Sequence, residues 1–392
     1  MLLSIALILI IGMFMGWVCK KLSLPSLLGM IITGILLGPY SLNLIDSSVL
    51  NISSELRRIA LVIILIRAGL ALELNDLKKV GRPAVLMCFI PACFEMLGVV
   101  FLAPKLLNVK ILDAAVMGSV LAAVSPAVIV PKMLKLIKEG YGTKKSIPQL
   151  ILAAASVDDV FVIVVFSVFT GTALKGSADV AELLKIPVSI VMGIAAGFII
   201  GYILSVYFMK VHIRDTVKVI ILLSMAFILL TAEDKFSDII PFSALIAVMC
   251  LGIALQEKRK AVAQRLSAKF NKLWVAAEVM LFVLVGATVD INYVKTAGVS
   301  ALILIFGALM FRMAGVYLCL IKTELEIKER LFCILAYMPK ATVQAAIGGV
   351  PLAMGLSCGN IVLAVAVLAI IITAPLGAFL IELTYKKWLS NS

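Results

Sequence analysis

Charged residues, histidines and paired cysteines are scarce in this sequence. Asp, Glu, Lys and Arg make up 15% of the 392 residues, whereas in soluble domains about a quarter of all residues are charged. There is one histidine, His212, and none of the seven cysteines belongs to a CxxC pair. These shortages argue against a histidine-rich metal site and a disulfide framework. No nucleophile with a neighbouring base and no nucleotide-binding loop is present either, so we expect neither an enzyme nor a bound cofactor.

Apolar residues dominate instead, and they occur in long runs. They make up 63% of the chain, whose mean hydropathy is +1.17. A run of about 18 mostly apolar residues is long enough to cross a bilayer as a helix. We therefore predict an all-α polytopic membrane protein with one transmembrane domain over residues 1–392. About thirteen crossings are expected: 2–18, 24–38, 56–72, 83–103, 111–134, 147–173, 187–209, 217–231, 239–255, 273–289, 298–321, 329–353 and 360–383.

Lysine and arginine are distributed unevenly between these segments. One set of alternate loops holds only Arg57, Arg58, Lys105, Lys110, Lys175, Lys185, Lys235 and Lys295, and the opposite set holds most of the others. Because cytoplasmic loops are enriched in Lys and Arg, the N-terminus is expected outside and the C-terminus in the cytoplasm of a cell inner membrane. The net charge of +13 then reflects topology and contact with anionic membrane lipids, and we expect no nucleic-acid partner.

Seven charged residues fall in the interior of the predicted crossings, away from their ends. A charge at the bilayer centre costs at least about 2.5 kcal/mol, so such residues usually face a bundle interior or a water-filled cavity. Asp158 and Asp159 are adjacent carboxylates near the middle of the crossing 147–173, with apolar runs on both sides. The others are Arg67, Glu95, Glu278, Arg312 and Lys340.

The aspartate pair indicates ion exchange. Residues i and i+1 of a helix point about 100° apart, so one carboxylate can face an ion path while the other contacts a cationic partner. A low dielectric disfavours an ionised carboxylate, which brings proton binding closer to physiological pH. The same oxygens suit a dehydrated hard cation. A carboxylate that holds either a proton or a cation is the minimal basis of antiport. The alternative is a pair of buried acids that basic side chains neutralise for packing alone.

Two predicted crossings contain helix-breaking residues. Pro126 and Pro131 lie in the crossing 111–134, and Pro339, Pro351 and the pair 348–349 (GG) lie in the crossing 329–353. Proline removes a backbone donor, and irregular backbone at membrane depth is tolerated where it is buried or lines a cavity. The two crossings traverse the membrane in opposite senses. This arrangement predicts inverted repeats, with the ion site between two discontinuous, crossing helices.

Four motifs, 66–72 (IRAGLAL), 123–128 (AVSPAV), 156–159 (SVDD) and 339–348 (PKATVQAAIG), resemble the two-aspartate branch of the cation/proton antiporter superfamily. They are most similar to NHA-type sodium (lithium)/proton exchangers, of which this would be a bacterial member. The resemblance implies a homodimer that exports Na⁺ or Li⁺ against H⁺ by elevator-type alternating access, for salt tolerance and pH homeostasis. It also implies a dimerisation part, approximately 1–82 and 187–289, and a mobile core transport part, approximately 83–173 and 298–383.

The resemblance further implies roles for single residues. Asp159 is the expected carboxylate for the transported Na⁺ and for the proton, and Asp158 is its neighbour in the ion site, paired with Arg312. Ser125 and Ser156 are expected to supply oxygen ligands or hydrogen-bond donors. Ser156 stands three residues before Asp159 and therefore shares its helical face.

A second group is expected to support this site. Glu95 and Lys340 would form another buried pair, with Arg312 as a shared charge partner, and Thr342 would cap or line the break in its helix. For these residues a purely structural role is an equal alternative.

Two departures from the family pattern bear on mechanism. Many members carry a glutamate directly after the Gly-Leu of the third crossing, where this chain has Ala71; Glu73, two residues on, is interpreted as an interfacial acid. Electrogenic relatives carry a lysine where this chain has Arg312. A buried lysine can release its proton and an arginine effectively cannot. We therefore predict electroneutral exchange, with Lys340 as an alternative proton carrier.

Two other functions fit parts of the same pattern. K⁺/H⁺ exchange on the same scaffold is one, because selectivity depends on cavity size and on the number of ligands. An ion channel or ion-controlled signalling membrane protein is the other. A simple pore does not need a proton-binding acid pair, which favours an exchanger.

Overall fold

The computed structural model describes residues 1–22, 24–72, 81–175, 180–236 and 241–391, and every regular element among them is a helix. The helices are α1 (Leu2–Lys21), α2 (Ser26–Leu37), α3 (Ser47–Asn51), α4 (Ser53–Ala71), α6 (Arg82–Met87), α7 (Ile90–Leu107), α8 (Ile111–Leu121), α9 (Pro126–Glu139), α10 (Ile147–Lys175), α11 (Val180–Lys210), α12 (Asp215–Phe236), α13 (Ala244–Lys258), α14 (Lys260–Ala287), α15 (Ile291–Cys319), α16 (Ile327–Ala336), α17 (Thr342–Ile347), α18 (Val350–Ala353) and α19 (Gly359–Trp388).

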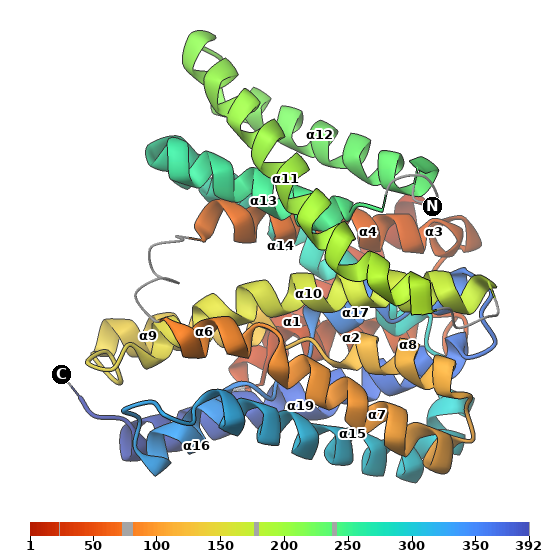
Figure 1. Ribbon diagram of the computed structural model, residues 1–392. Helices are drawn as coiled ribbons and strands as arrows, with labels where there is room; N and C mark the ends of the chain where they lie inside the picture. The colour runs from red at the N-terminus through yellow and green to blue at the C-terminus, as the bar shows by residue number, and fades with distance from the viewer. Residues whose placement is uncertain (23, 73–80, 176–179, 237–240, 392) are drawn as a thin grey trace.

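The helices confirm a multi-pass membrane protein. Within the described part of the chain, nine helical segments are long and apolar enough to cross a bilayer: Leu2–Lys21, Arg82–Leu107, Ile111–Glu139, Ile147–Leu174, Pro187–Lys210, Asp215–Phe236, Lys260–Ala287, Gly298–Cys319 and Gly359–Trp388. Helices also occupy the other predicted ranges, but these are shorter or more polar, so the count of thirteen stays a prediction. The two termini lie at opposite ends of the bundle (Figure 1), as an odd number of crossings requires.

The helices form two sets that pack mainly within themselves. In the first helix set (α1, α2, α4 and α11 to α14), α11 packs on α13, and α14 packs on α2 and α4. In the second helix set (α6 to α10 and α15 to α19), α15 packs on α7, and α10 packs on α8 and α9. Contacts of α4 and α14 with α17, and of α10 with α11 and α13, join the two sets. Figure 1 shows α11 to α14 above and most of the second helix set below.

Close backbone contact holds α2 against α14. A Cβ atom added at Gly34 would lie 2.0 Å from the carbonyl oxygen of Val283, and one added at Gly286 would lie 2.2 Å from that of Ile31. Small residues let membrane helices approach closely, and dispersion contacts then stabilise the pair. The glycines are therefore required by this interface.

Both predicted helix breaks are present, and they meet in space. α8 ends at Leu121 and α9 begins at Pro126, which suits the first helical position because its missing N–H would have no helical partner there. Ser125 is extended, with φ −95° and ψ 109°, the conformation favoured before proline. α16 and α17 are interrupted around Pro339, whose carbonyl accepts the backbone N–H of Ser125 at 2.8 Å. The two broken helices run in opposite directions (Figure 1).

Two features differ from the sequence-based expectation. The predicted crossing 83–103 is interrupted at Cys88 and Phe89, between α6 and α7, and Pro91 lies in the first turn of α7. The predicted crossing 273–289 corresponds to the second half of α14. The basic segment before it belongs to the same helix, which begins at Lys260. Hydropathy alone finds the apolar part of such a helix and misses its polar end.

The α2–α14 contact gives a stability prediction. Gly34→Ala forces a methyl group into backbone atoms that cannot rotate away, and overpacking of this kind costs about 1–3 kcal/mol. Gly171→Ala is the matched control, because nothing lies within 4 Å of a Cβ added at Gly171 in α10. We expect Gly34→Ala to lower the thermal unfolding midpoint of the detergent-purified protein and Gly171→Ala to leave it unchanged or raised. Equal midpoints for both variants would contradict the close contact.

Candidate functional site

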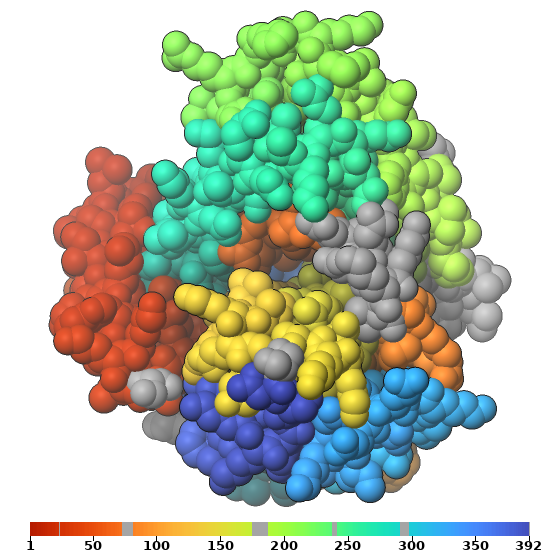
Figure 2. Space-filling model, turned by 90° about the vertical axis from the view of Figure 1, so that its left-hand side faces the viewer, coloured from red at the N-terminus to blue at the C-terminus, as the bar shows by residue number. Residues whose placement is uncertain are grey.

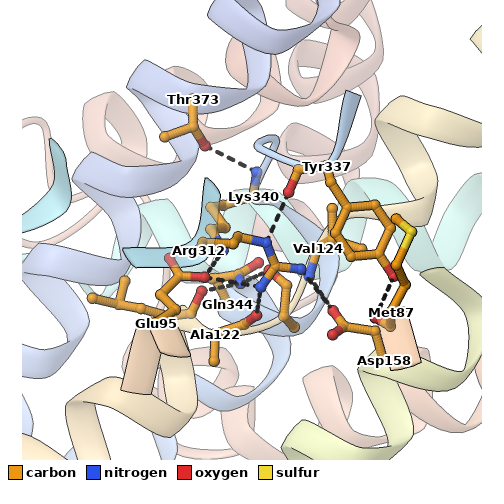
Figure 3. Close-up of polar contacts among 12 residues, drawn as sticks. Met87, Glu95, Ala122, Val124, Asp158, Arg312, Tyr337, Lys340, Gln344 and Thr373 are labelled. Atoms are coloured by element: carbon orange, nitrogen blue, oxygen red, sulfur yellow. Dashed lines mark hydrogen bonds and ion pairs between the residues drawn. The ribbon is translucent and has the colours of Figure 1, made fainter. Parts of the chain in front are cut away.

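Arg312 of α15 lies between the two helix breaks (Figure 3). Its side chain is 1% exposed. The Nε–H donates to the carbonyl of Tyr337 at 2.8 Å, and Nη1 donates to the carbonyl of Ala122. Tyr337 caps α16 and Ala122 caps α8, so one guanidinium satisfies carbonyls that the ends of two helices leave without helical partners.

The same guanidinium contacts two carboxylates. Nη2 lies 3.1 Å from Oδ2 of Asp158, and Nη1 lies 2.9 Å from Oε2 of Glu95. Glu95 also pairs with Lys340, whose Nζ lies 2.5 Å from the same oxygen. All four side chains are 2% exposed or less. Two acids thus face two bases, and the formal charge of this four-residue network (Glu95, Asp158, Arg312 and Lys340) is zero.

Asp158 and Asp159 face different surroundings. Oδ2 of Asp158 also accepts the backbone N–H of Val124 at 2.8 Å, which ties α10 to the break after α8. Asp159 makes no ion pair within the described part of the chain, and its Oδ1 atom is buried without a hydrogen-bond partner there. Asp159 lines a cavity that Asp158 does not reach. This division follows from the rotation of about 100° between successive helical residues.

The cavity lies between the two helix sets and has a volume of about 1120 Å³. Its lining comes from α1, α2, α4, α9, α10, α14, α17 and α19. Lys20, Lys132 and Glu382 contribute to it near the end of the molecule that carries the C-terminus. Figure 2 looks at this end and shows a hollow between the red N-terminal segment, the teal segment of α13 and α14, and the yellow segment of α9 and α10. The cavity therefore connects Asp159 with the end of the molecule that carries the C-terminus (Figure 2).

The other predicted oxygen ligands lie near this carboxylate or the breaks. Ser156 lines the cavity, and its hydroxyl donates to the Leu152 carbonyl at 2.9 Å, which leaves oxygen lone pairs available. Thr342, the first residue of α17, lines the same cavity, and its Oγ1 is buried without a partner in the described chain. Ser125 is fully buried at the other break, outside the cavity lining, with its Oγ likewise unpartnered. Glu73 lies outside the described residues.

Sequence reasoning missed two residues that hold the breaks in place. The Oε1 atom of Gln344 accepts the Ala341 N–H at 2.9 Å, and its Nε2 donates to the carbonyls of Leu121 at 3.2 Å and Ala123 at 2.7 Å. The Tyr337 hydroxyl donates to the Met87 carbonyl at 3.1 Å, where α6 ends. A glutamine inside an apolar crossing was the available signal, because a buried amide needs hydrogen-bond partners.

The arrangement leaves the Asp159 carboxylate without an ionic partner in the described chain. Because the four-residue network is already neutral, the charge of Asp159 is the surplus negative charge of this region. Ser156 and Thr342 add neutral oxygens on the same cavity wall. Within the described residues, no group of three or more His, Cys, Asp or Glu side chains could hold a resident metal ion. A proton or one monovalent hard cation would neutralise Asp159, and the two cannot occupy it together.

Comparison with known proteins agrees with this chemistry. The family described as "Sodium/hydrogen exchanger, transmembrane" matches residues 5–387. Sodium/hydrogen exchanger 9B2 of Homo sapiens is 34% identical over 387 residues, which cover 94% of this chain and 70% of the relative. Sodium/hydrogen exchanger 9B1 of Homo sapiens is 31% identical over 385 residues, which cover 94% of this chain and 73% of the relative.

A solved structure shares the fold. The sodium proton antiporter MjNhaP1 from Methanocaldococcus jannaschii, determined at pH 8, matches with a TM-score of 0.87. The match covers 98% of this chain and 97% of that chain at 22% sequence identity. At this level of identity the likeness shows the arrangement of helices alone.

The bridge made by Gln344 gives a second stability prediction. Gln344→Leu keeps the side-chain size but removes three hydrogen bonds, and each buried group left unsatisfied costs about 1–3 kcal/mol. Gln256→Leu is the matched control, because Gln256 is also buried but its Oε1 has no partner in the described part of the chain. We expect the thermal midpoint to fall clearly for Gln344→Leu and much less for Gln256→Leu. A larger loss at Gln256 would show that Gln344 does not join the breaks.

Proposed function

The chain belongs to the sodium/hydrogen exchanger family, and from this premise we propose that it is a secondary antiporter that exchanges Na⁺ or Li⁺ for H⁺ across a cell inner membrane. One observation carries the proposal. Asp159 is a carboxylate in a cavity, beside a neutral network that leaves it without an ionic partner in the described chain. Binding of a proton and binding of a cation at one carboxylate exclude each other, which couples the two fluxes.

The ion site consists of the Asp159 carboxylate and nearby neutral oxygens. A hard monovalent cation prefers oxygen ligands, and Ser156 and Thr342 present hydroxyl oxygens to the same cavity. Asp158 is proposed as the neighbour of this site: its Oδ2 stays bound to Arg312, and its Oδ1 is buried behind the cavity wall and unpartnered in the described residues. Ser125 is proposed as a further oxygen ligand or hydrogen-bond donor, because its Oγ is buried at the break and unpartnered in the described residues.

We further propose elevator-type alternating access by movement of the second helix set. The dimerisation part comprises approximately 1–82 and 187–289, and the core transport part approximately 83–173 and 298–383. The packing of the helices within two sets, with the cavity between them, supports this division. A movement of the core part would carry Asp159 and both breaks together, because Arg312 and Gln344 join them rigidly.

The orientation follows from the loop charges. We propose that the N-terminus lies outside and the C-terminus in the cytoplasm, so that the cavity is open to the cytoplasm in this conformation. The opposite positions of the termini and the basic loops support this topology (Figure 1). We also propose a homodimer that uses the first helix set, in which α1 and α11 expose many large apolar side chains.

Exchange is proposed to be electroneutral. Arg312 is fixed by two carbonyls and two carboxylates, and a guanidinium stays protonated in proteins. Its charge therefore remains constant through the cycle, and Asp159 alone changes between its proton-bound and cation-bound forms.

Liposomes with an imposed pH gradient and a fluorescent pH reporter test the function. We expect Na⁺ and Li⁺ to dissipate the gradient in the wild type and choline to have no effect. Asp159→Asn removes the exchangeable carboxylate and should abolish the response. Glu324→Gln, a loop acid exposed to solvent, is the control and should retain it.

Other outcomes of this assay would change the assignment. A response to K⁺ alone would make the protein a K⁺/H⁺ exchanger with the same mechanism. Cation flux without proton movement would support the channel reading. Full activity of folded Asp159→Asn would remove Asp159 from the mechanism.

Electroneutrality predicts that transport is independent of membrane potential. A potential of 100 mV acts with about 2.3 kcal/mol on one net charge, so electrogenic exchange would respond strongly. We expect equal Na⁺-driven rates in liposomes whose membrane potential is clamped with valinomycin and K⁺ at zero and at about −100 mV. Rates that change several-fold with the potential would contradict a one-to-one exchange.

A further inference from the structure

A second intramembrane carboxylate lines the same cavity. Glu278 of α14 belongs to the wall formed by the first helix set, whereas Asp159 belongs to the wall formed by the second. Ser267 and Asn271 of α14 also line the cavity. They lie four residues apart, and Glu278 follows Asn271 by seven residues, so the three share one face of the helix. α14 therefore presents a polar stripe to the cavity.

The α10 wall carries a matching stripe. Gln149, Ser156 and Asp159 all line the cavity, and the Oε1 atom of Gln149 is buried without a hydrogen-bond partner in the described chain. Most of the remaining wall from α4 is apolar, with Leu61 and Ile64 among its residues. An ion that enters from the cavity mouth thus meets oxygen atoms along two lines.

Glu278 is close to a positive charge but is not ion-paired with it. Arg67 of α4 and Glu278 attract each other electrostatically. Among the ion pairs of the described residues, however, none joins these two side chains within 4.0 Å. The Arg67 guanidinium instead lies over the ring of Trp274, 5.3 Å from its centroid. The Glu278 carboxylate accepts a hydrogen bond from the Trp274 side chain, and it lines the cavity without an ion pair to the described residues.

We propose that Glu278 is a second, transient site for the transported monovalent cation, occupied between the cavity mouth and Asp159, and that Arg67 keeps its affinity low. This inference rests on the proposed exchange function. A carboxylate inside the membrane is costly and usually serves an ion path. Conduction requires a site that attracts the ion and also releases it. The Arg67 guanidinium favours release of the cation from Glu278, because its positive charge repels the bound cation.

The same geometry defines the ligand class. Glu278 supplies the one carboxylate of this site, whereas Asn271 and Ser267 lie seven and eleven residues away, roughly 10 and 16 Å along the helix axis, and offer neutral oxygens on the approach to it. The charge of Arg67 offsets that of Glu278, so a divalent cation would add two positive charges to a region without surplus negative charge. The site therefore suits a small monovalent cation that keeps part of its hydration shell.

Kinetics of the two charge variants test the inference. In the liposome assay, Glu278→Gln should raise the KM for Na⁺ roughly fivefold or more, the lower end of typical coupling between two binding sites, with little change in maximal rate. Arg67→Gln should lower both the KM and the maximal rate, because the ion is then held more tightly. Glu324→Gln is the control: this exposed loop acid lies outside the cavity lining, and the KM of the variant should match the wild type.

A binding measurement separates this inference from the exchange function. In Asp159→Asn protein, weak Na⁺ binding detected by ²³Na NMR line broadening should persist, and it should disappear in Asp159→Asn/Glu278→Gln. If the wild type shows no exchange, the proposed function fails. If the wild type exchanges but Glu278→Gln has an unchanged KM, or loses maximal rate and thermal stability together, only the second site is overturned.

Discussion

The structure depends on the fixed position of one guanidinium. Arg312 donates to the carbonyls of Ala122 and Tyr337 and to the carboxylates of Glu95 and Asp158. Backbone that leaves a helix inside a membrane needs partners within the protein, because the bilayer offers none. Here the side chains of Arg312 and Gln344 donate hydrogen bonds to the backbone carbonyls at the two breaks, so two interrupted helices can meet at membrane depth. The site exists because their exposed carbonyls are satisfied from within.

The contrast between neighbouring aspartates follows from that constraint. Asp158 is held by Arg312 and by the Val124 N–H, and removal of one partner from a buried ion pair leaves an uncompensated charge that costs about 3–5 kcal/mol. Its charge is therefore part of the architecture. Asp159 belongs to the same helical turn but faces the cavity, where a mobile ion can serve as its partner. One turn of α10 thus contains a carboxylate that is fixed in the network and a carboxylate without an ionic partner in the described chain, which is the one we propose to be exchangeable.

Local sequence features predicted much of the fold. Prolines 126 and 339 located both breaks, and charged residues in apolar runs located the network around Arg312, because each of these features is costly without a specific structure. Other parts depend on contacts between distant segments. Gln344 joins the carbonyls of residues more than two hundred positions away, and no periodicity indicates this pairing. The α6–α7 interruption and the length of α14 were also missed, since hydropathy reports composition and not backbone geometry.

The order of synthesis gives the network another consequence. Glu95 and Asp158 precede their partner Arg312 by 217 and 154 residues, and Lys340 follows later still. During insertion, the ribosome delivers both acids long before either base. The growing chain must therefore keep these carboxylates protonated or in contact with water until the last third of the protein arrives. Assembly of the network becomes a late step of biogenesis, and a chain stopped before α15 would hold two acids in the membrane without their basic partners.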